Sequence, residues 1–195
     1  MEYQKLLIHI IILKLTWNFI ILIIKMLARI SKRLLHINQS IPHLKLVVCS
    51  GNEGKYNIER DIDSETYFAN KKVVLIGFPG AYTPTCTGTH IPQFVKLQEN
   101  FDQKGVELIG LAVNDPFVLK EFGQDMGGKI AYIADGSGYF TRALDAGLDL
   151  TEKGLGYRTR RFTALVENGV ITQVNDENGG QLTAISSAET ILKSI

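Results

Sequence analysis

Cys86 is the residue of this sequence that is best placed for chemistry. It follows an apolar run, Val73–Phe78, which has the length and β-branched content of a buried strand. Thr83 and Pro84 then favour the start of a helix, because threonine caps helix N-termini and proline has no N–H to leave unpaired there. We therefore expect Cys86 in the first helical turn, where free N–H groups and the helix dipole stabilise a thiolate. The alternative is a small, buried and inert cysteine.

The other potential ligands and thiols limit the possible chemistry. The chain has two cysteines and four histidines, and neither set shows metal-ligand spacing. Cys49 ends a short apolar segment, so we expect a packed core thiol. A disulfide-exchanging protein has C-x-x-C at the helix start, whereas Thr83 stands here in place of the first cysteine. A single activated thiolate can attack an electrophilic oxygen and become a sulfenic acid, and we expect neither a metal nor a bound organic cofactor.

Charge and hydropathy separate the first 40 residues from the rest. Residues 1–40 hold six basic residues and one acidic residue, whereas the remaining chain holds 15 basic and 19 acidic residues. The net negative charge of residues 41–195 argues against nucleic-acid binding. Leu6–Ile24 is similar to the apolar region of a signal sequence, but polar residues interrupt it, so it is not a clear membrane span. Lys25–Arg33 is basic and acid-free, as in a transit peptide.

We therefore predict that residues 1–40 are a bipartite targeting leader and that residues 41–195 form the folded domain. Such leaders resemble those that direct proteins through the secretory route into a secondary plastid, as in an apicoplast. Import into a mitochondrion and a cytoplasmic location are alternatives. An amphipathic helix of the fold and a stable membrane anchor are two further interpretations of this segment. Otherwise, we expect membrane contact only through the leader.

The rest of the chain alternates strand and helix signals. The predicted strands are 44–49, 72–78, 106–113, 130–134, 159–167 and 170–174, and the predicted helices are 61–70, 84–104, 116–126, 139–144 and 186–195. Asn168-Gly169 joins the last two strands in the clearest hairpin, because Asn-Gly strongly favours a two-residue turn. This order predicts an α/β domain of the thioredoxin-like fold, in which helices flank a mixed central sheet.

The segment around Cys86 resembles the peroxiredoxin family. Its pattern is the family's Pro79-x-x-x-Thr83-x-x-Cys86, and the wider run GFPGAYTPTCTGTHIPQF is similar to the type II, or peroxiredoxin-five-like, subfamily. The similarity extends through GVELIGLAVNDPFVLKEF and YRTRRFTALVENGVI and covers roughly residues 41–195. The resemblance implies a thioredoxin-fold peroxiredoxin domain that reduces hydrogen peroxide and alkyl hydroperoxides. It also implies a homodimer built through loops and helix ends near the active site.

The resemblance further implies roles for four residues. Cys86 would attack the terminal peroxide oxygen as a thiolate. Thr83 would hold the thiolate and the attacked oxygens in line, and Pro79 would shape the pocket and shield the sulfenic acid from water. The family has an arginine before an aromatic residue on a late strand, which Arg161-Phe162 matches, and its permanent charge would stabilise the thiolate and the peroxide. The alternatives are a helix cap for Thr83 and an exposed strand cation for Arg161.

The sequence departs from the two-cysteine members of the subfamily at Ala184. Those members carry a resolving cysteine in a C-terminal segment similar to Gly180–Ala184. We therefore expect a one-Cys cycle, in which glutathione, glutaredoxin or thioredoxin reduces the sulfenic acid of Cys86, with Cys49 as the alternative resolving thiol. His90 is expected to pack and hydrogen-bond near the site. Two rival functions stay open, a thioredoxin-like redox-sensing or chaperone module and a glutathione-dependent thiol transferase.

Overall fold

The computed structural model describes residues 14, 16–17, 19–21, 35–52 and 55–195. The chain divides into two units, residues 1–34 and residues 35–195, and the described residues of the first unit are helical. Within the described residues, no helix combines the length and apolar character that a membrane span requires. Most of the predicted leader lies outside the described residues, so its targeting role stays a prediction.

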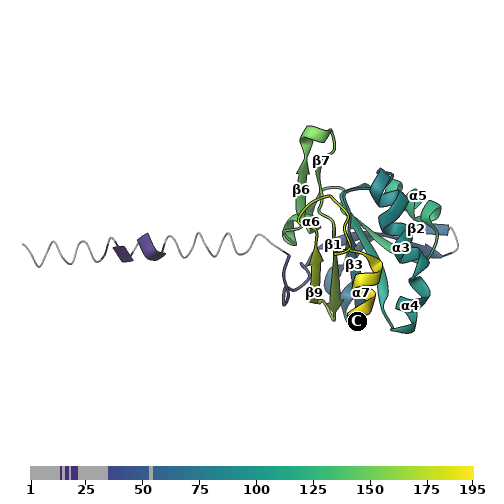
Figure 1. The fold of residues 1–195 in the computed structure, drawn as a ribbon, viewed down its shortest axis with the longest axis horizontal. Helices are drawn as coiled ribbons and strands as arrows, with labels where there is room; N and C mark the ends of the chain where they lie inside the picture. Colours follow the sequence, from purple (N-terminus) through teal and green to yellow (C-terminus); the bar gives the residue numbers. More distant parts are fainter. Residues whose placement is uncertain (1–13, 15, 18, 22–34, 53–54) are drawn as a thin grey trace, which may run out of the picture. The chain divides into compact units, whose positions relative to one another are not determined.

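A mixed sheet forms the centre of the second unit. In the described part of the chain it has seven strands in the order β2-β1-β5-β4-β3-β8-β9, with β3, β4 and β5 parallel to one another. Its strands are β1 (Lys45–Asn52), β2 (Lys55–Asp63), β3 (Lys72–Gly77), β4 (Glu107–Ala112), β5 (Ala131–Ala134), β8 (Phe162–Glu167) and β9 (Val170–Asp176). Two further strands, β6 (Gly147–Leu150) and β7 (Gly156–Thr159), pair only with each other and project from the domain as an arm (Figure 1).

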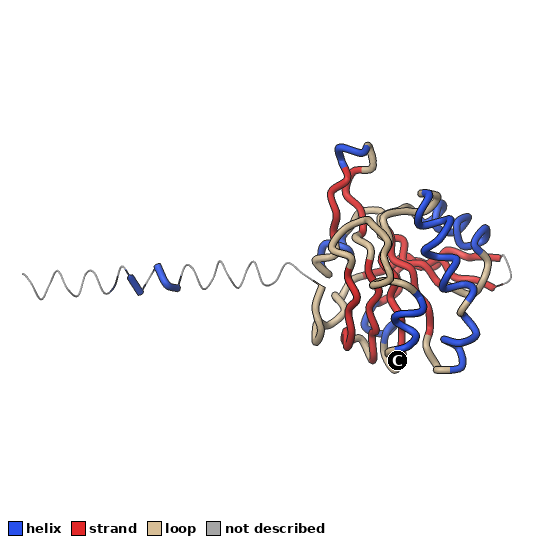
Figure 2. The backbone as a smooth tube through the Cα atoms, viewed as in Figure 1, coloured by secondary structure: helices blue, strands red, loops and turns tan. Residues whose placement is uncertain are grey.

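Helices cover both faces of this sheet, with the strands between them (Figure 2). The helices on one face are α3 (Ile91–Lys96), α4 (Gln98–Gln103), α5 (Pro116–Met126) and α7 (Ala188–Lys193), and those on the other are α2 (Ser64–Phe68) and α6 (Tyr139–Ala143). Alternate residues of β3 serve the two cores, since Val74 and Ile76 face the first group whereas Val73 and Leu75 face the second. The predicted α/β class, with a mixed sheet between helices, is confirmed.

The predicted hairpin is confirmed at its turn. Asn168 and Gly169 have φ values of 49° and 76° and join β8 to β9, as a turn with two positive φ angles requires. The prediction of one strand over residues 159–167 was wrong, however. Thr159 ends β7, and Phe162 begins β8. Between them the backbone changes partners, because Arg160 N–H donates to Ala146 O of the α6–β6 connection and Arg161 N–H donates to Gly179 O.

The strand β2 and the start of the domain also differ from the prediction. Asp61–Asp63 belongs to β2, and the helix that follows spans only Ser64–Phe68, with Asp63 as its N-cap. The edge strand β2 escaped prediction because it is mostly polar and half exposed.

Residues 35–40, which the prediction assigned to the leader, lie along β9 of the folded unit. Leu35 is buried in the second core, and Asn38 N–H donates to Ile171 O. The folded unit therefore begins at Leu35.

Candidate active site

Cys86 follows the loop that connects β3 to the helices of the first core. The loop is fixed from the neighbouring parallel strand, since Asn114, just after β4, accepts a hydrogen bond through Oδ1 from Ala81 N–H at 3.0 Å. Tyr82 has a φ of 60°, a left-handed conformation that turns the chain toward the helix. Parallel strands end at the same edge of a sheet, so this loop lies where α/β proteins place their sites. Cys86 itself is fully buried.

The predicted single helix over residues 84–104 is instead broken into segments. Cys86–His90 forms a π-helix, in which Ile91 N–H donates to Cys86 O five residues back. It continues into α3, and Leu97 then separates α3 from α4. A π-turn inserts one extra residue per turn and is frequent at functional sites. It changes the spacing on the helix face, so the four-residue separation of Cys86 and His90 does not place them as in an α-helix.

Arg161 is the charged group at the thiol. Its Nη2 donates to Cys86 Sγ at 3.4 Å, across 75 residues of sequence. Nε and Nη2 also donate to Gly180 O at 3.1 and 3.0 Å. The residue is 1% exposed, and its Nη1 atom is buried without a hydrogen-bond partner among the described residues. The alternative of an exposed strand cation is therefore wrong.

The two neighbouring arginines have other partners. Arg160 forms a partly buried, bidentate ion pair with Asp176 of β9, with Nη2 to Oδ2 at 2.7 Å. Arg158 donates to the carbonyls of Leu155 and Val113. Among the three, the structure brings only Arg161 to the thiol.

Pro79 and Thr83 line a pocket beside this pair. The pocket has a volume of about 700 Å³, and Arg161 also lines it. Its walls include half-buried leucines of the β6–β7 arm and the segment after β9; they are Leu148, Leu150, Leu155 and residues 177–181. Thr83 Oγ1 donates to Gly80 O at 2.9 Å. The threonine hydroxyl thus lies at the pocket, but its hydrogen bond in this structure goes to the loop backbone.

His90 packs behind the site, as expected. The ring is fully buried against Phe94, and Nε2 lies 3.3 Å from Ser186 O, which fixes it as the donor of a neutral imidazole. Burial, followed by the charge of Arg161, lowers the pKa of His90 to about 3. This histidine is therefore neutral at physiological pH and links the π-helix to the C-terminal segment.

Cys49 is confirmed as a packed core thiol. It lies fully buried in β1, and its Sγ donates to Pro116 O at 3.2 Å. Burial raises its pKa to about 11. A thiol with this environment is protonated at physiological pH and is a poor nucleophile.

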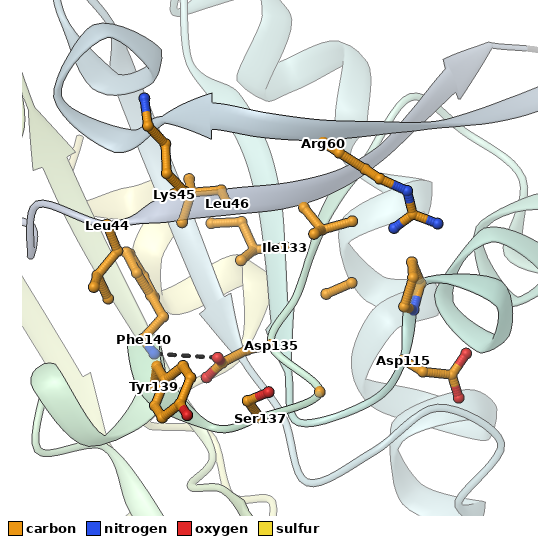
Figure 3. A pocket seen from close by; sticks show the side chains of 14 residues that line it. Leu44, Lys45, Leu46, Arg60, Asp115, Ile133, Asp135, Ser137, Tyr139 and Phe140 are labelled. Carbon is orange, nitrogen blue, oxygen red and sulfur yellow. Dashed lines mark hydrogen bonds between the residues drawn. The ribbon is translucent and has the colours of Figure 1, made fainter.

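Two further features lie away from Cys86. A pocket of about 270 Å³ opens between the start of β1 and the β5–α6 connection, where Asp135 accepts from Phe140 N–H (Figure 3). At the surface, His43, Asp63 and Glu65 have ligand atoms within 4.8 Å of one another. Spacing rules missed this group because His43 lies 20 residues before Asp63 in the sequence. Asp63 already has two partners, since it accepts from His43 at 2.9 Å and from the neighbouring Lys45 at 3.4 Å.

Taken together, the mixed α/β sheet and a buried thiol beside an arginine at the end of a parallel strand are typical of thioredoxin-fold redox proteins. The family model described as Redoxin matches residues 38–192. Peroxiredoxin-2D of Arabidopsis thaliana is 48% identical over 130 residues, which cover 65% of this chain and 80% of the relative. The chloroplastic Peroxiredoxin-2E of the same plant is 42% identical over 132 residues, which cover 65% of this chain and 56% of the relative.

Solved structures agree with these relatives. Reduced Prx3 from Vibrio vulnificus in complex with H2O2 has a TM-score of 0.73 at 33% identity, covering 83% of this chain and 100% of that chain. The antioxidant protein of Plasmodium falciparum, described as a 1-Cys peroxiredoxin, has a TM-score of 0.71 at 29% identity, covering 80% and 97%. This chain belongs to the redoxin family and is a peroxiredoxin, a thiol-dependent peroxidase.

Sequence reasoning missed three parts of this site. No role in the site was predicted for Asn114, although its place directly after the predicted strand 106–113 was a usable signal. The β6–β7 arm consists of two four-residue strands outside the main sheet, so it has no core pattern to detect. Glu177 lines the pocket from the segment after β9, and no motif marks it.

Proposed function

We propose that this peroxiredoxin works with Cys86 as its only reacting thiol and Arg161 as the electrostatic partner of that thiol. The observation that carries the proposal is the guanidinium of Arg161. Nη2 lies 3.4 Å from Cys86 Sγ, whereas Nη1 is buried and unpaired among the described residues. A buried donor without a partner is costly. A peroxide oxygen in the adjoining pocket would accept its hydrogen bond.

The chemical step follows from these groups. The Cys86 thiolate attacks the terminal peroxide oxygen, an S–O bond forms as the O–O bond breaks, and the hydroxide or alkoxide leaves and takes up a proton. Cys86 becomes a sulfenic acid, and the peroxide becomes water or an alcohol. Arg161 keeps its charge at any working pH, so it stabilises both the thiolate and the departing oxygen. We assign Thr83 to aligning the peroxide oxygens and Pro79 to shaping the pocket and excluding water.

We assign the reduction of the Cys86 sulfenic acid back to the thiol to an external reductant. An outside thiolate attacks the sulfenic sulfur and releases its oxygen as water, and a second outside thiol reduces the mixed disulfide and restores Cys86. Cys49, the other cysteine of the chain, is buried and protonated. Ala184 is exposed and carries no sulfur. The similarity to the 1-Cys peroxiredoxin of Plasmodium falciparum supports this cycle, for which glutathione, glutaredoxin or thioredoxin would serve.

The proposed substrates are hydrogen peroxide and alkyl hydroperoxides. The similarity to the Vibrio vulnificus Prx3 that was solved in complex with H2O2 supports the first. The pocket supports the second, since about 700 Å³ exceeds what hydrogen peroxide needs and half-buried leucines line one side. This reaction needs neither a metal nor an organic cofactor, because the thiolate supplies both electrons.

We also propose a homodimer that forms at the edge of the sheet next to the site. Tyr82, Phe117 and Tyr139 are 50%, 65% and 69% exposed. They follow β3, β4 and β5, three parallel strands whose carboxyl ends share one edge. Large exposed aromatic side chains in neighbouring loops are typical of protein interfaces. Sedimentation analysis of the full chain tests this: a dimer is expected, and Phe117→Asp with Tyr139→Asp should give monomers.

For the N-terminal segment we propose an organellar leader, with a secondary plastid as the destination and a mitochondrion or the cytoplasm as alternatives. The chloroplastic relative supports an organelle, and the composition of residues 1–40 supports a two-part signal. Residues 35–40 pack on β9, so we assign the signal to residues upstream of Leu35. A reporter fused to residues 1–34 tests this, and diffuse cytosolic fluorescence would exclude the leader.

Peroxide consumption by the full chain tests the proposed cycle. With glutathione as the reductant, we expect turnover by the wild type and by Cys49→Ser and none by Cys86→Ser. Loss of turnover in Cys49→Ser would show that Cys49 resolves the sulfenic acid and would refute the one-Cys cycle. A wild type that ignores peroxide but reduces glutathione mixed disulfides would be a thiol transferase. A wild type that does neither, while Cys86 still oxidises slowly, would fit a redox-sensing or chaperone module.

A further inference from the structure

Arg161 is held by the segment after β9, residues 177–187, which we call the C-terminal loop. Arg161 N–H donates to Gly179 O at 2.8 Å, and Glu177 N–H donates to Arg161 O at 3.1 Å. The side chain donates through both Nε and Nη2 to Gly180 O. One carbonyl of the loop therefore sets the direction of the guanidinium that reaches Cys86.

The carboxylate of Glu177 joins the start of this loop to its later residues, Thr183 and Ser186. It accepts hydrogen bonds from Thr183 N–H at 3.0 Å, Thr183 Oγ1 at 2.8 Å, Ser186 N–H at 3.1 Å and Ser186 Oγ at 2.8 Å. Desolvation of Glu177 raises its pKa, but these four hydrogen bonds outweigh it and lower the pKa below the ordinary value. The group is therefore charged at neutral pH, and all four bonds are charge-assisted.

The same loop contacts the helix that carries the thiol. Ser186, which donates twice to Glu177, accepts through its carbonyl from His90 Nε2 at 3.3 Å. His90 ends the π-helix that begins at Cys86. Glu177 thus holds together a loop whose Gly180 end orients Arg161 and whose Ser186 end meets the helix of Cys86.

We propose that Glu177 is a positioning residue for the peroxidase reaction, which it supports by fixing the C-terminal loop and, through Gly180 O, the guanidinium of Arg161. This inference rests on the proposed role of Arg161. Glu177 acts through the loop because both oxygens of its carboxylate already bind Thr183 and Ser186. The carboxylate accepts all four bonds with the strength that its charge gives them. A glutamine amide could keep the three bonds at Oε1, but it would remove the charge and turn its NH2 group toward Thr183 Oγ1, which would then have to accept.

Single-turnover oxidation of Cys86 by hydrogen peroxide tests the proposal with the full-length Glu177→Gln variant. We expect the rate constant to fall about tenfold, in line with the rate cost of a small misplacement of a reacting group. The pH at which Cys86 becomes reactive toward iodoacetamide should rise in the same variant, because the guanidinium no longer sits firmly at the sulfur. Glu152→Gln is the matched control. Glu152 is an exposed carboxylate on the turn of the β6–β7 arm, and its loss should change neither quantity.

A double-variant cycle separates positioning from general damage. If Glu177 acts through Arg161, then adding Glu177→Gln to Arg161→Met should lower the rate no further. A tenfold loss that persists in the Arg161→Met background would overturn the inference, as would a Glu177→Gln enzyme with the wild-type rate and pH profile. An Arg161→Met enzyme with the wild-type rate would instead refute the role of Arg161. If Glu177→Gln fails to fold, Thr183→Val with Ser186→Ala removes two of the donors, keeps the carboxylate, and must lower the rate in the same direction.

Discussion

Replacing Arg161 with methionine is the sharpest test of how this site works. Methionine fills a similar volume but removes the donor 3.4 Å from Cys86 Sγ and both bonds to Gly180 O. A charged group that donates to a developing or resident anion in a buried site is worth about 2.7–4 kcal/mol of transition-state stabilisation, which corresponds to a rate loss of about 10²–10³. We therefore expect hydrogen peroxide to oxidise Cys86 in Arg161→Met about a hundred- to a thousandfold more slowly than in the wild type.

The measurement is the loss of free thiol from the reduced full chain, mixed with excess hydrogen peroxide and quenched at short times. Lys153→Met is the control, because it removes an exposed positive charge from the same pocket. Exposed charges act weakly through solvent, so this control should stay within about threefold of the wild type, a change of under 1 kcal/mol. Arg161→Lys should lie between the two, since an ammonium keeps the charge but cannot reproduce the fork that bonds the sulfur and the carbonyl together.

One result would refute this reasoning. If Arg161→Met is folded, as judged by its circular dichroism and a cooperative thermal transition, and still oxidises within threefold of the wild type, then the guanidinium does not stabilise the reacting charges. The contact of Nη2 with the thiol would then have only a structural role.

Three buried groups allow further tests. Cys49→Ser should leave glutathione-dependent turnover unchanged, whereas its loss would make this thiol part of the cycle. His90 binds a proton more readily in the unfolded chain, near pH 6.5, than in the folded chain, near pH 3, so wild-type stability should fall with decreasing pH in this window by up to about 1.4 kcal/mol per pH unit. Urea unfolding of His90→Gln should show a flatter profile there, and an equally steep one would contradict the assignment. Leu35→Ala should lower the free energy of unfolding by about 2 kcal/mol. An unchanged free energy would mean that Leu35 belongs to the leader and not to the folded core.

The sequence predicted the parts of the fold that local signals encode. The apolar run Val73–Phe78 identified the central strand. The predicted helix over residues 116–126 coincides with α5, whose N-cap Asp115 accepts from Phe117 and Val118 N–H. Asn168-Gly169 identified the last hairpin. Each signal depends on residues within a few positions of one another, so it can be recognised in the sequence without knowledge of tertiary contacts.

The sequence could not predict features that depend on distant partners. The break between β7 and β8 exists because Arg160 and Arg161 exchange strand pairing for contacts with Ala146 and Gly179. Leu35 looked like an extension of the basic leader, yet it is buried because the chain beside it pairs with β9. Arg161 was chosen from a family pattern, and only the fold shows that it reaches the sulfur while its neighbours do not.

The C-terminal loop contains no cysteine, and this absence is connected with the geometry at Cys86. The resemblance to the two-cysteine members of the subfamily implies that their resolving cysteine lies in this part of the chain. Here Ala184 takes that place, and the loop is closed by Glu177 and holds Arg161 through Gly180 O. A loop that must leave to deliver a thiol would withdraw the guanidinium at each turnover. In the proposed one-Cys cycle an external reductant supplies the thiol, so the loop keeps Arg161 in position throughout turnover.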